Sequence, residues 1–443
     1  MSLARNSALA FTAQIVSLGL SFIGSIVVSR WLGPEGRGVL SLLVVLSEMA
    51  AGIATWGLGP AYAYLAGKSA HRMAALVGSS LILAAGLGLI SGLGMIAAGP
   101  WLLEHVLRGL LPRHLAIAAV AMPFVFLTFF LSSVMLGSGR VREAALMQVY
   151  TTSLSVVAGI VVLPVLGLGL EAMVVVFALT AAIGALWYLM FLVSQVGLSF
   201  RGLRAIARDA FTYGFQAYLG SVTGYFWLRA DVLILNAWAG PGAVGQYTLA
   251  THLGERIWLF DTSIDRAVLP EVIKGDEKST AHLVARTARN LWLVTGVPAL
   301  LLALAAPWLV PFVYGEPFRP AVLPLILLLP GIVALAVSRV ISSYFSGQLG
   351  RPIITSMVSL ATMITGIVAY LALIPGHGAA GAALGSTIAY IVPMAVYVVL
   401  FPRVTGLRAR DILLLNSDDR SLYPRLIRRA LGNLIPKRSR AET

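Results

Sequence analysis

The chain carries Gly33-Pro34-Glu35-Gly36-Arg37-Gly38 and, 207 residues later, Gly240-Pro241-Gly242-Ala243-Val244-Gly245. Each stretch ends one apolar run that is long enough to cross a membrane, and another apolar run follows it. This recurrence predicts that one membrane-embedded half is present twice in the chain.

The composition indicates that lipid surrounds most of the protein. Hydrophobic residues make up 58% of the 443 residues and charged residues only 11%, which a water-soluble core could not accommodate. The chain has no cysteine, so disulfides, thiolate metal sites and cysteine nucleophiles are excluded. The sequence therefore predicts an all-α integral membrane protein.

Apolar runs of about 20 residues, the length that crosses the hydrocarbon core of a bilayer, predict twelve transmembrane helices. We expect them near residues 8–29, 39–66, 73–98, 115–136, 145–168, 171–194, 211–236, 243–264, 288–313, 321–346, 353–374 and 379–401.

The positions of Lys and Arg predict the orientation of these helices. Most of the 32 basic residues fall at the amino terminus, in the connections after even-numbered spans, or in the tail from residue 403. By the positive-inside rule both termini are cytoplasmic, and the protein is a multi-pass protein of the cytoplasmic (inner) membrane. The net charge of +14 then reflects loops that face anionic lipid, and no nucleic-acid partner is expected.

A further marker repeats at nearly the same offset. A Gly-then-Arg turn follows the fourth span at Gly137 to Arg140 and the tenth at Gly347 to Arg351. Because six spans separate the copies, both halves face the same way, as parallel repeats. We therefore expect two parallel six-helix lobes around a central cavity. The predicted parts are an N-terminal lobe (1–198), a cytoplasmic linker (199–210), a C-terminal lobe (211–402) and a basic cytoplasmic tail (403–443) with the pattern of an amphipathic surface helix.

The run from Ser29 to Leu42, SRWLGPEGRGVLSL, resembles the first helix and loop of the polysaccharide-transporter branch of the multidrug/oligosaccharide/polysaccharide exporter superfamily. The resemblance extends over residues 1–402. It implies a flippase that moves a lipid-linked oligosaccharide, a polyprenyl-diphosphate sugar, across the membrane by alternating access. Related peptidoglycan-precursor flippases carry two more helices, which residues after 402 do not supply, so an oligosaccharide flippase is favoured over a lipid II flippase.

Ionisable residues at membrane depth are costly and mark candidate sites. Arginines offer paired donors to phosphate oxygens, and tryptophans can stack on sugar rings. The candidate substrate-binding residues are Arg229, Arg256, Arg339, Arg30, Arg37, Trp227 and Trp258.

A second group of residues could couple transport to an ion, either H⁺ or Na⁺. The first predicted helix holds no acid, in contrast to drug-exporting relatives, so other spans must supply one. The candidates are Glu48, Asp231, His252, Glu255, Asp261 and Asp265. The alternative is structural: Arg229 pairs with Asp231 or Glu255, and Arg256 pairs with an acid on a neighbouring helix.

Two other functions are weighed. A drug or metabolite cation antiporter of the same superfamily is the main alternative. A multispan glycosyltransferase would need clustered outward acids, and this chain offers only scattered ones at Glu35, Glu104, Glu171 and Glu316. We expect no enzyme, no catalytic residues, no metal and no cofactor apart from a coupling ion. The expected partners are the lipid-linked oligosaccharide, membrane lipids and glycan-assembly enzymes, and we expect a monomer.

Overall fold

The computed structural model describes residues 3–68, 73–414 and 416, and every regular element in this part of the chain is helical. The predicted amphipathic helix in the tail falls mostly on residues 417–443, which lie outside the described residues. The elements in chain order are α1 (Leu3–Ala54), α2 (Leu58–Lys68), α3 (Met73–Ala97), α4 (Gly99–His105), α5 (Pro112–Gly137), α6 (Val141–Ile160), η2 (Val161–Val165), α7 (Leu170–Val196), α8 (Leu203–Glu255), α9 (Trp258–Lys274), α10 (Glu277–Tyr314), η3 (Glu316–Ala321), α11 (Val322–Ser343), η4 (Tyr344–Gln348), α12 (Pro352–Thr405) and α13 (Arg410–Leu413).

The chain is a multi-pass membrane protein. Within the described residues, eight helices are long and apolar enough to cross a membrane. Several lie where the apolar runs predict them, for example α3 (Met73–Ala97) and α7 (Leu170–Val196). These helices match the predicted spans because bilayer thickness fixes the length of an apolar run.

Three predicted loops are instead single-residue breaks inside long helices. Gly33 interrupts α1, Gly240 interrupts α8 and Gly378 interrupts α12, each with a positive φ. Gly33 (φ 65°, ψ −173°) and Gly240 (φ 76°, ψ 179°) share one backbone conformation that side chains disfavour, and a proline follows each. The repeated sequence therefore produces the same local break twice.

The helix α10 begins eleven residues earlier than predicted, at Glu277 instead of residue 288. Its first turn is capped by Asp276, whose carboxylate accepts hydrogen bonds from the backbone N–H and hydroxyl of Ser279 at 3.0 and 2.6 Å. These bonds, first of all the one from the hydroxyl, lower the pKa of Asp276. The extension stays helical because one face, including Val284 and Ala288, is fully buried in the core of its unit.

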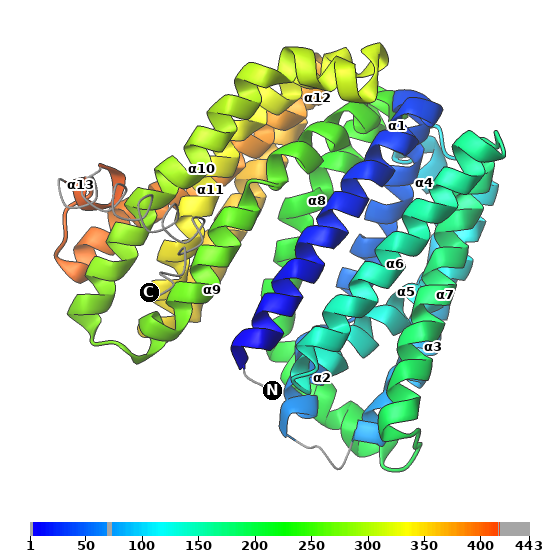
Figure 1. The fold of residues 1–443 in the computed structure, drawn as a ribbon, viewed down its shortest axis with the longest axis horizontal. Helices are drawn as coiled ribbons and strands as arrows, with labels where there is room; N and C mark the ends of the chain where they lie inside the picture. Colours follow the sequence, from blue (N-terminus) through cyan, green and yellow to red (C-terminus); the bar gives the residue numbers. More distant parts are fainter. Residues whose placement is uncertain (1–2, 69–72, 415, 417–443) are drawn as a thin grey trace, which may run out of the picture. The chain divides into compact units, whose positions relative to one another are not determined.

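The chain divides into two compact units. The first comprises Met1–His252, Ala305–Leu327 and Met363–Ser386, and the second comprises Leu253–Leu304, Leu328–Thr362 and Thr387–Thr443. In the first unit α3 packs against α5, α5 against α7, and α1 against α6, as the ribbon shows (Figure 1). The second unit is built around a core that includes Tyr344, Phe345 and Phe401. The predicted lobe boundaries stay a prediction.

Inside the first unit the two glycine-marked stretches cross each other reciprocally. A methyl group at Gly38 would overlap the carbonyl oxygen of Pro241, and one at Gly245 would overlap the carbonyl oxygen of Pro34. Ser41 and Thr248 hydrogen-bond across the crossing, with 3.1 Å between their hydroxyl oxygens and 207 residues between them in sequence. The 207-residue offset exchanges the Gly38–Pro241 and Gly245–Pro34 contacts and relates Ser41 to Thr248, which is the signature of a local two-fold axis.

The crossing predicts a large effect of a single methyl group. We expect Gly38→Ala and Gly245→Ala to lower the thermal stability of the purified protein, because overpacking of this kind costs about 1–3 kcal/mol or more. Gly19→Ala is the matched control on α1, since a methyl group there meets nothing within 4 Å. Equal melting temperatures for all three variants in detergent would contradict the crossing.

Candidate functional site

Charged groups from the two copies meet in the first unit. Nε of Arg229, on α8 before its break, lies 3.8 Å from Oε2 of Glu48, on α1 after its break. The side chain of Arg229 is 20% exposed and that of Glu48 is 50% exposed. At 3.8 Å the pair is an ionic contact that is longer than a hydrogen bond.

The sequence offers Asp231 and Glu255 as partners of Arg229. The structure adds Glu48 as a further partner. Glu48 and Glu255 are equivalent under the 207-residue offset, so the two copies place an acid at the same position. Sequence spacing could not identify Glu48 as a partner of Arg229, because Glu48 lies on the other copy.

Arg37 lies within the crossing. Its side chain is only 3% exposed, and Nη1 donates to the hydroxyls of Ser25 and Ser29 at 2.8 and 2.7 Å and to the Ser25 carbonyl at 3.2 Å. Nη2 lies 3.2 Å from Nδ1 of His252, which must be unprotonated at that atom to accept the bond. The guanidinium therefore bridges both sides of the Gly33 break and the second copy, while its buried Nε has no partner.

Arg30 caps a helix. Its guanidinium donates to the carbonyls of Val313 (2.8 Å) and Phe312 at the end of α10. A cation at the carboxyl end of a helix satisfies unpaired carbonyls and favours the helix dipole. The sequence placed Arg30 on the substrate path, and the structure shows it holding α1 to the end of α10.

Asp231 lies in a cluster of hydroxyl groups. The carboxylate is buried and accepts hydrogen bonds from the hydroxyl of Tyr247, the hydroxyl of Ser386 (3.4 Å) and the backbone N–H of Val232 (2.7 Å). Ser386 also bonds the hydroxyls of Tyr247 (2.8 Å) and Tyr370 (3.1 Å). The cluster joins α8 and α12, and its three hydroxyl residues were not predicted because nothing in the local spacing links them to Asp231.

In the second unit Arg339 and Asp261 form a buried ion pair. Nη1 of Arg339 lies 3.3 Å from Oδ2 of Asp261, which is 1% exposed, and Oδ1 of the same carboxylate has no hydrogen-bond partner. The guanidinium carbon stacks 4.2 Å from the ring centre of Trp258, whose indole N–H donates to the carbonyl of Ile332 (3.2 Å). The structure thus brings into contact three residues that were predicted separately, Arg339, Asp261 and Trp258.

The structure places the remaining predicted residues on the following elements. Arg256 lies between α8 and α9, where the predicted eighth span is interrupted, and Glu255 ends α8. Asp265 lies on α9, and the side chain of Trp227 is outside the described residues. No group of three or more His, Cys, Asp or Glu side chains among the described residues could hold a metal ion.

The long apolar helices with paired breaks define a multi-pass helical membrane fold, and comparison with solved structures finds the same fold. The chain matches lipid II flippase MurJ in an inward closed conformation with a TM-score of 0.74, 13% identity and 96% coverage of both chains. It matches an inward-facing MATE family multidrug resistance transporter of the MOP superfamily with a TM-score of 0.70 and 19% identity, over 88% of this chain and 94% of the other.

The family follows from the sequence. The model of the polysaccharide biosynthesis protein family matches residues 3–274, and the chain belongs to this family. It is also 24% identical over 402 residues to the probable low-salt glycan biosynthesis flippase Agl15 of Haloferax volcanii, covering 88% of this chain and 82% of that protein. The resemblance inferred from residues 29–42 is confirmed.

The ion pair of the second unit gives a test of buried charge. We expect Arg339→Met to destabilise the protein by about 3–5 kcal/mol, because it leaves the Asp261 carboxylate buried without its partner. The double variant Arg339→Met/Asp261→Leu should recover much of that loss. Arg319→Met is the control, since its pair with Glu316 is exposed and its loss should hardly change the stability. Equal denaturant midpoints for Arg339→Met and Arg319→Met would contradict the pairing.

Proposed function

We propose that the protein is a flippase that moves a polyprenyl-diphosphate-linked oligosaccharide across the cytoplasmic membrane by alternating access. In this proposal twelve transmembrane helices form two parallel six-helix lobes, residues 1–198 and 211–402, around a central cavity, with both termini in the cytoplasm. The observation that carries the proposal is the partly exposed Arg229–Glu48 contact, which joins the two copies.

The chemistry of the cargo explains why such charges would persist in lipid. The polyprenyl tail can remain in the bilayer, whereas the diphosphate and sugars need a hydrated route with cations along it. Guanidinium groups offer paired donors to phosphate oxygens. Among the described arginines we assign this role to Arg229, whose side chain is 20% exposed and contacts Glu48 of the other copy.

The loose contact with Glu48 suggests how cargo would bind. An arriving diphosphate competes with one carboxylate for Arg229, so binding releases Glu48 and changes the contact between the copies. Arg256, next to the interruption between α8 and α9, is a further candidate to bind the cargo, and Glu255 is a further candidate for ion coupling. In this proposal glycan-assembly enzymes supply the cargo.

For ion coupling we place Asp231 first among the acids. Its carboxylate accepts hydrogen bonds from the hydroxyls of Tyr247 and Ser386 and from the backbone N–H of Val232. Such a carboxylate can accept either a proton or a small cation. H⁺ and Na⁺ both fit the oxygen ligands of this cluster.

A flipping assay tests the proposal. The protein is reconstituted in vesicles with a fluorescent polyprenyl-diphosphate oligosaccharide, and the fraction reaching the outer leaflet is measured with and without proton and sodium gradients. We expect Arg229→Gln to reduce the rate at least about tenfold, equivalent to 1.4 kcal/mol or more. Asp231→Asn should remove the acceleration of flipping by a proton or sodium gradient, while flipping without a gradient persists.

Arg113→Gln is the control, because this arginine pairs with Glu171 and is exposed. No flipping by the wild type, combined with export of a cationic drug, would replace the proposal with a cation antiporter. Wild-type rates in Arg229→Gln would overturn the assignment of the diphosphate ligand.

A further inference from the structure

A pocket lies beside the Gly33 break, where the first part of α1 approaches the end of α10 in the first unit. Its walls include Arg30 and Trp31 from α1, Tyr314 from the end of α10 and Phe318 from η3. The pocket has a volume of about 520 Å³. Among the described residues that line it, Arg30 is the charged one, and we call it the Arg30 pocket.

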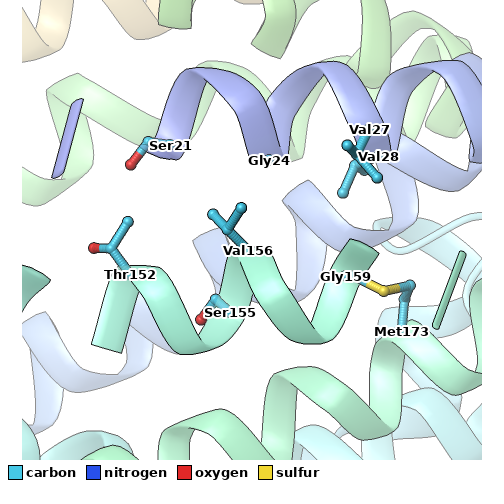
Figure 2. Close-up of a pocket in the computed structure, with 9 residues that line it drawn as sticks. All are labelled: Ser21, Gly24, Val27, Val28, Thr152, Ser155, Val156, Gly159 and Met173. Atoms are coloured by element: carbon cyan, nitrogen blue, oxygen red, sulfur yellow. The ribbon is translucent and has the colours of Figure 1, made fainter. Parts of the chain in front are cut away.

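A groove between α1 and α6 in the same unit differs from this pocket in its chemistry. All nine described residues that line the groove are uncharged (Figure 2). Val156 of α6 packs against Gly24 of α1, so a side chain already fills part of the groove. The lining of the groove does not select a charged ligand, whereas that of the Arg30 pocket does.

The guanidinium of Arg30 keeps donors for a ligand. It carries five N–H donors, and two of them bind the carbonyls of Val313 and Phe312. Within residues 3–68 and 73–414, no carboxylate forms an ion pair with Arg30. The other three N–H groups therefore remain for a ligand in the pocket.

A second cation lies behind the pocket wall. Arg37 is 3% exposed, and its Nη1 donates to the hydroxyl of Ser29, a wall residue, at 2.7 Å. Its other partners, Ser25 and the unprotonated Nδ1 of His252, are neutral, and no described carboxylate pairs with it. Its buried Nε has no partner. Buried charges are normally paired, and the described groups around Arg37 supply no counter-charge.

The nearby acids do not cancel this positive charge. Glu316, at the start of η3, binds Arg319 through both carboxylate oxygens at 2.8 and 2.9 Å. Glu35 is exposed and lies against Gly242 of the other copy, away from the pocket lining. The end of α10 contributes about half a negative charge, against one positive charge on each of the two arginines. The pocket is therefore net positive and selects an anion.

The surface around the pocket indicates that this anion belongs to a lipid. Trp31 at the pocket is 53% exposed, and on α10 Trp308 is 75% and Phe312 80% exposed. The carbonyl of Phe312 is one of the two that Arg30 binds. Aromatic side chains this exposed on membrane-spanning helices contact lipid, and tryptophan is enriched at the level of the headgroups. The anion that reaches Arg30 from this surface is the phosphate of a lipid.

We propose that the Arg30 pocket binds the phosphate group of a membrane lipid. Arg30 donates to the phosphate directly, and Arg37 supplies buried positive charge behind Ser29. The inference rests on the proposed function only for its orientation, which puts this end of α1 at the outer leaflet. A phospholipid of that leaflet and cargo that has just crossed the membrane both present phosphate oxygens there.

Photolabelling of the purified protein tests the site without requiring transport. Phosphatidylglycerol and a polyprenyl diphosphate, each with a diazirine beside the phosphate, are added separately in detergent, and labelled peptides are identified by mass spectrometry. We expect labels on residues 29–33 and 314–318, and the lipid that labels more strongly is the source of the phosphate. Arg30→Gln should reduce this labelling about tenfold or more, the scale of a lost charge-assisted hydrogen bond.

A second variant leaves the carbonyl bonds of Arg30 in place. Trp31→Glu puts a carboxylate on an exposed side chain at the pocket, and it should reduce labelling to a similar extent because it repels the phosphate. The matched control is Trp238→Glu, at the position equivalent to Trp31 under the 207-residue offset. Trp238 is 58% exposed and does not line the pocket, so this control should label like the wild type.

Three results would overturn the lipid-phosphate site. They are wild-type labelling in Trp31→Glu and Arg30→Gln, equal labelling by a diazirine diacylglycerol that lacks the phosphate, and displacement of the lipid by an equal concentration of inorganic phosphate. Flipping is measured separately. Flipping by a wild type that is not labelled here overturns the site and leaves the proposed function standing, whereas labelling here without flipping does the reverse.

Discussion

The structure of the first unit depends on a close approach of two backbones. At Gly38 and Gly245 each copy places a residue without a side chain against a proline carbonyl of the other copy. Such an approach brings the flanking helices close enough for the hydroxyls of Ser41 and Thr248 to bond, and for Arg37 to reach His252. The polar contacts between the copies follow from the missing side chains at these two glycines.

Around this crossing the charges take on different roles. Arg37 and Arg30 are bound by hydroxyls, carbonyls and an imidazole, and they hold the breaks in place. Arg229 lies 3.8 Å from the half-exposed acid Glu48. Charges that hold the helix breaks and charges that join the two copies at partly exposed positions thus lie on the same helices.

Much of the fold could be predicted from the sequence. Apolar run length fixed the positions of α3, α5 and α7, and the repeated Gly-Pro stretch identified the duplicated breaks at Gly33 and Gly240. The interruption between α1 and α2 near Gly57 was missed. There the backbone packs against Gly214, a contact from another part of the chain that local hydropathy does not contain.

The candidate site was harder to predict. The sequence identified which ionisable residues lie at membrane depth, because charge in an apolar run is conspicuous. It could not identify partners such as Glu48 for Arg229, or Tyr370 and Ser386 for the Asp231 cluster, because those contacts join distant helices. The groove between α1 and α6 was also invisible, since its lining consists of ordinary small and apolar residues.

The most direct test of the crossing is a disulfide between its two central residues. The chain has no native cysteine, so Ser41→Cys/Thr248→Cys can be oxidised in membranes without background. The hydroxyl separation of 3.1 Å is compatible with disulfide geometry, and we expect efficient cross-linking. The out-of-register pair Ser47→Cys/Thr248→Cys, about 9 Å further along the helix, should not cross-link. Cross-linking of the out-of-register pair alone would contradict the two-fold crossing.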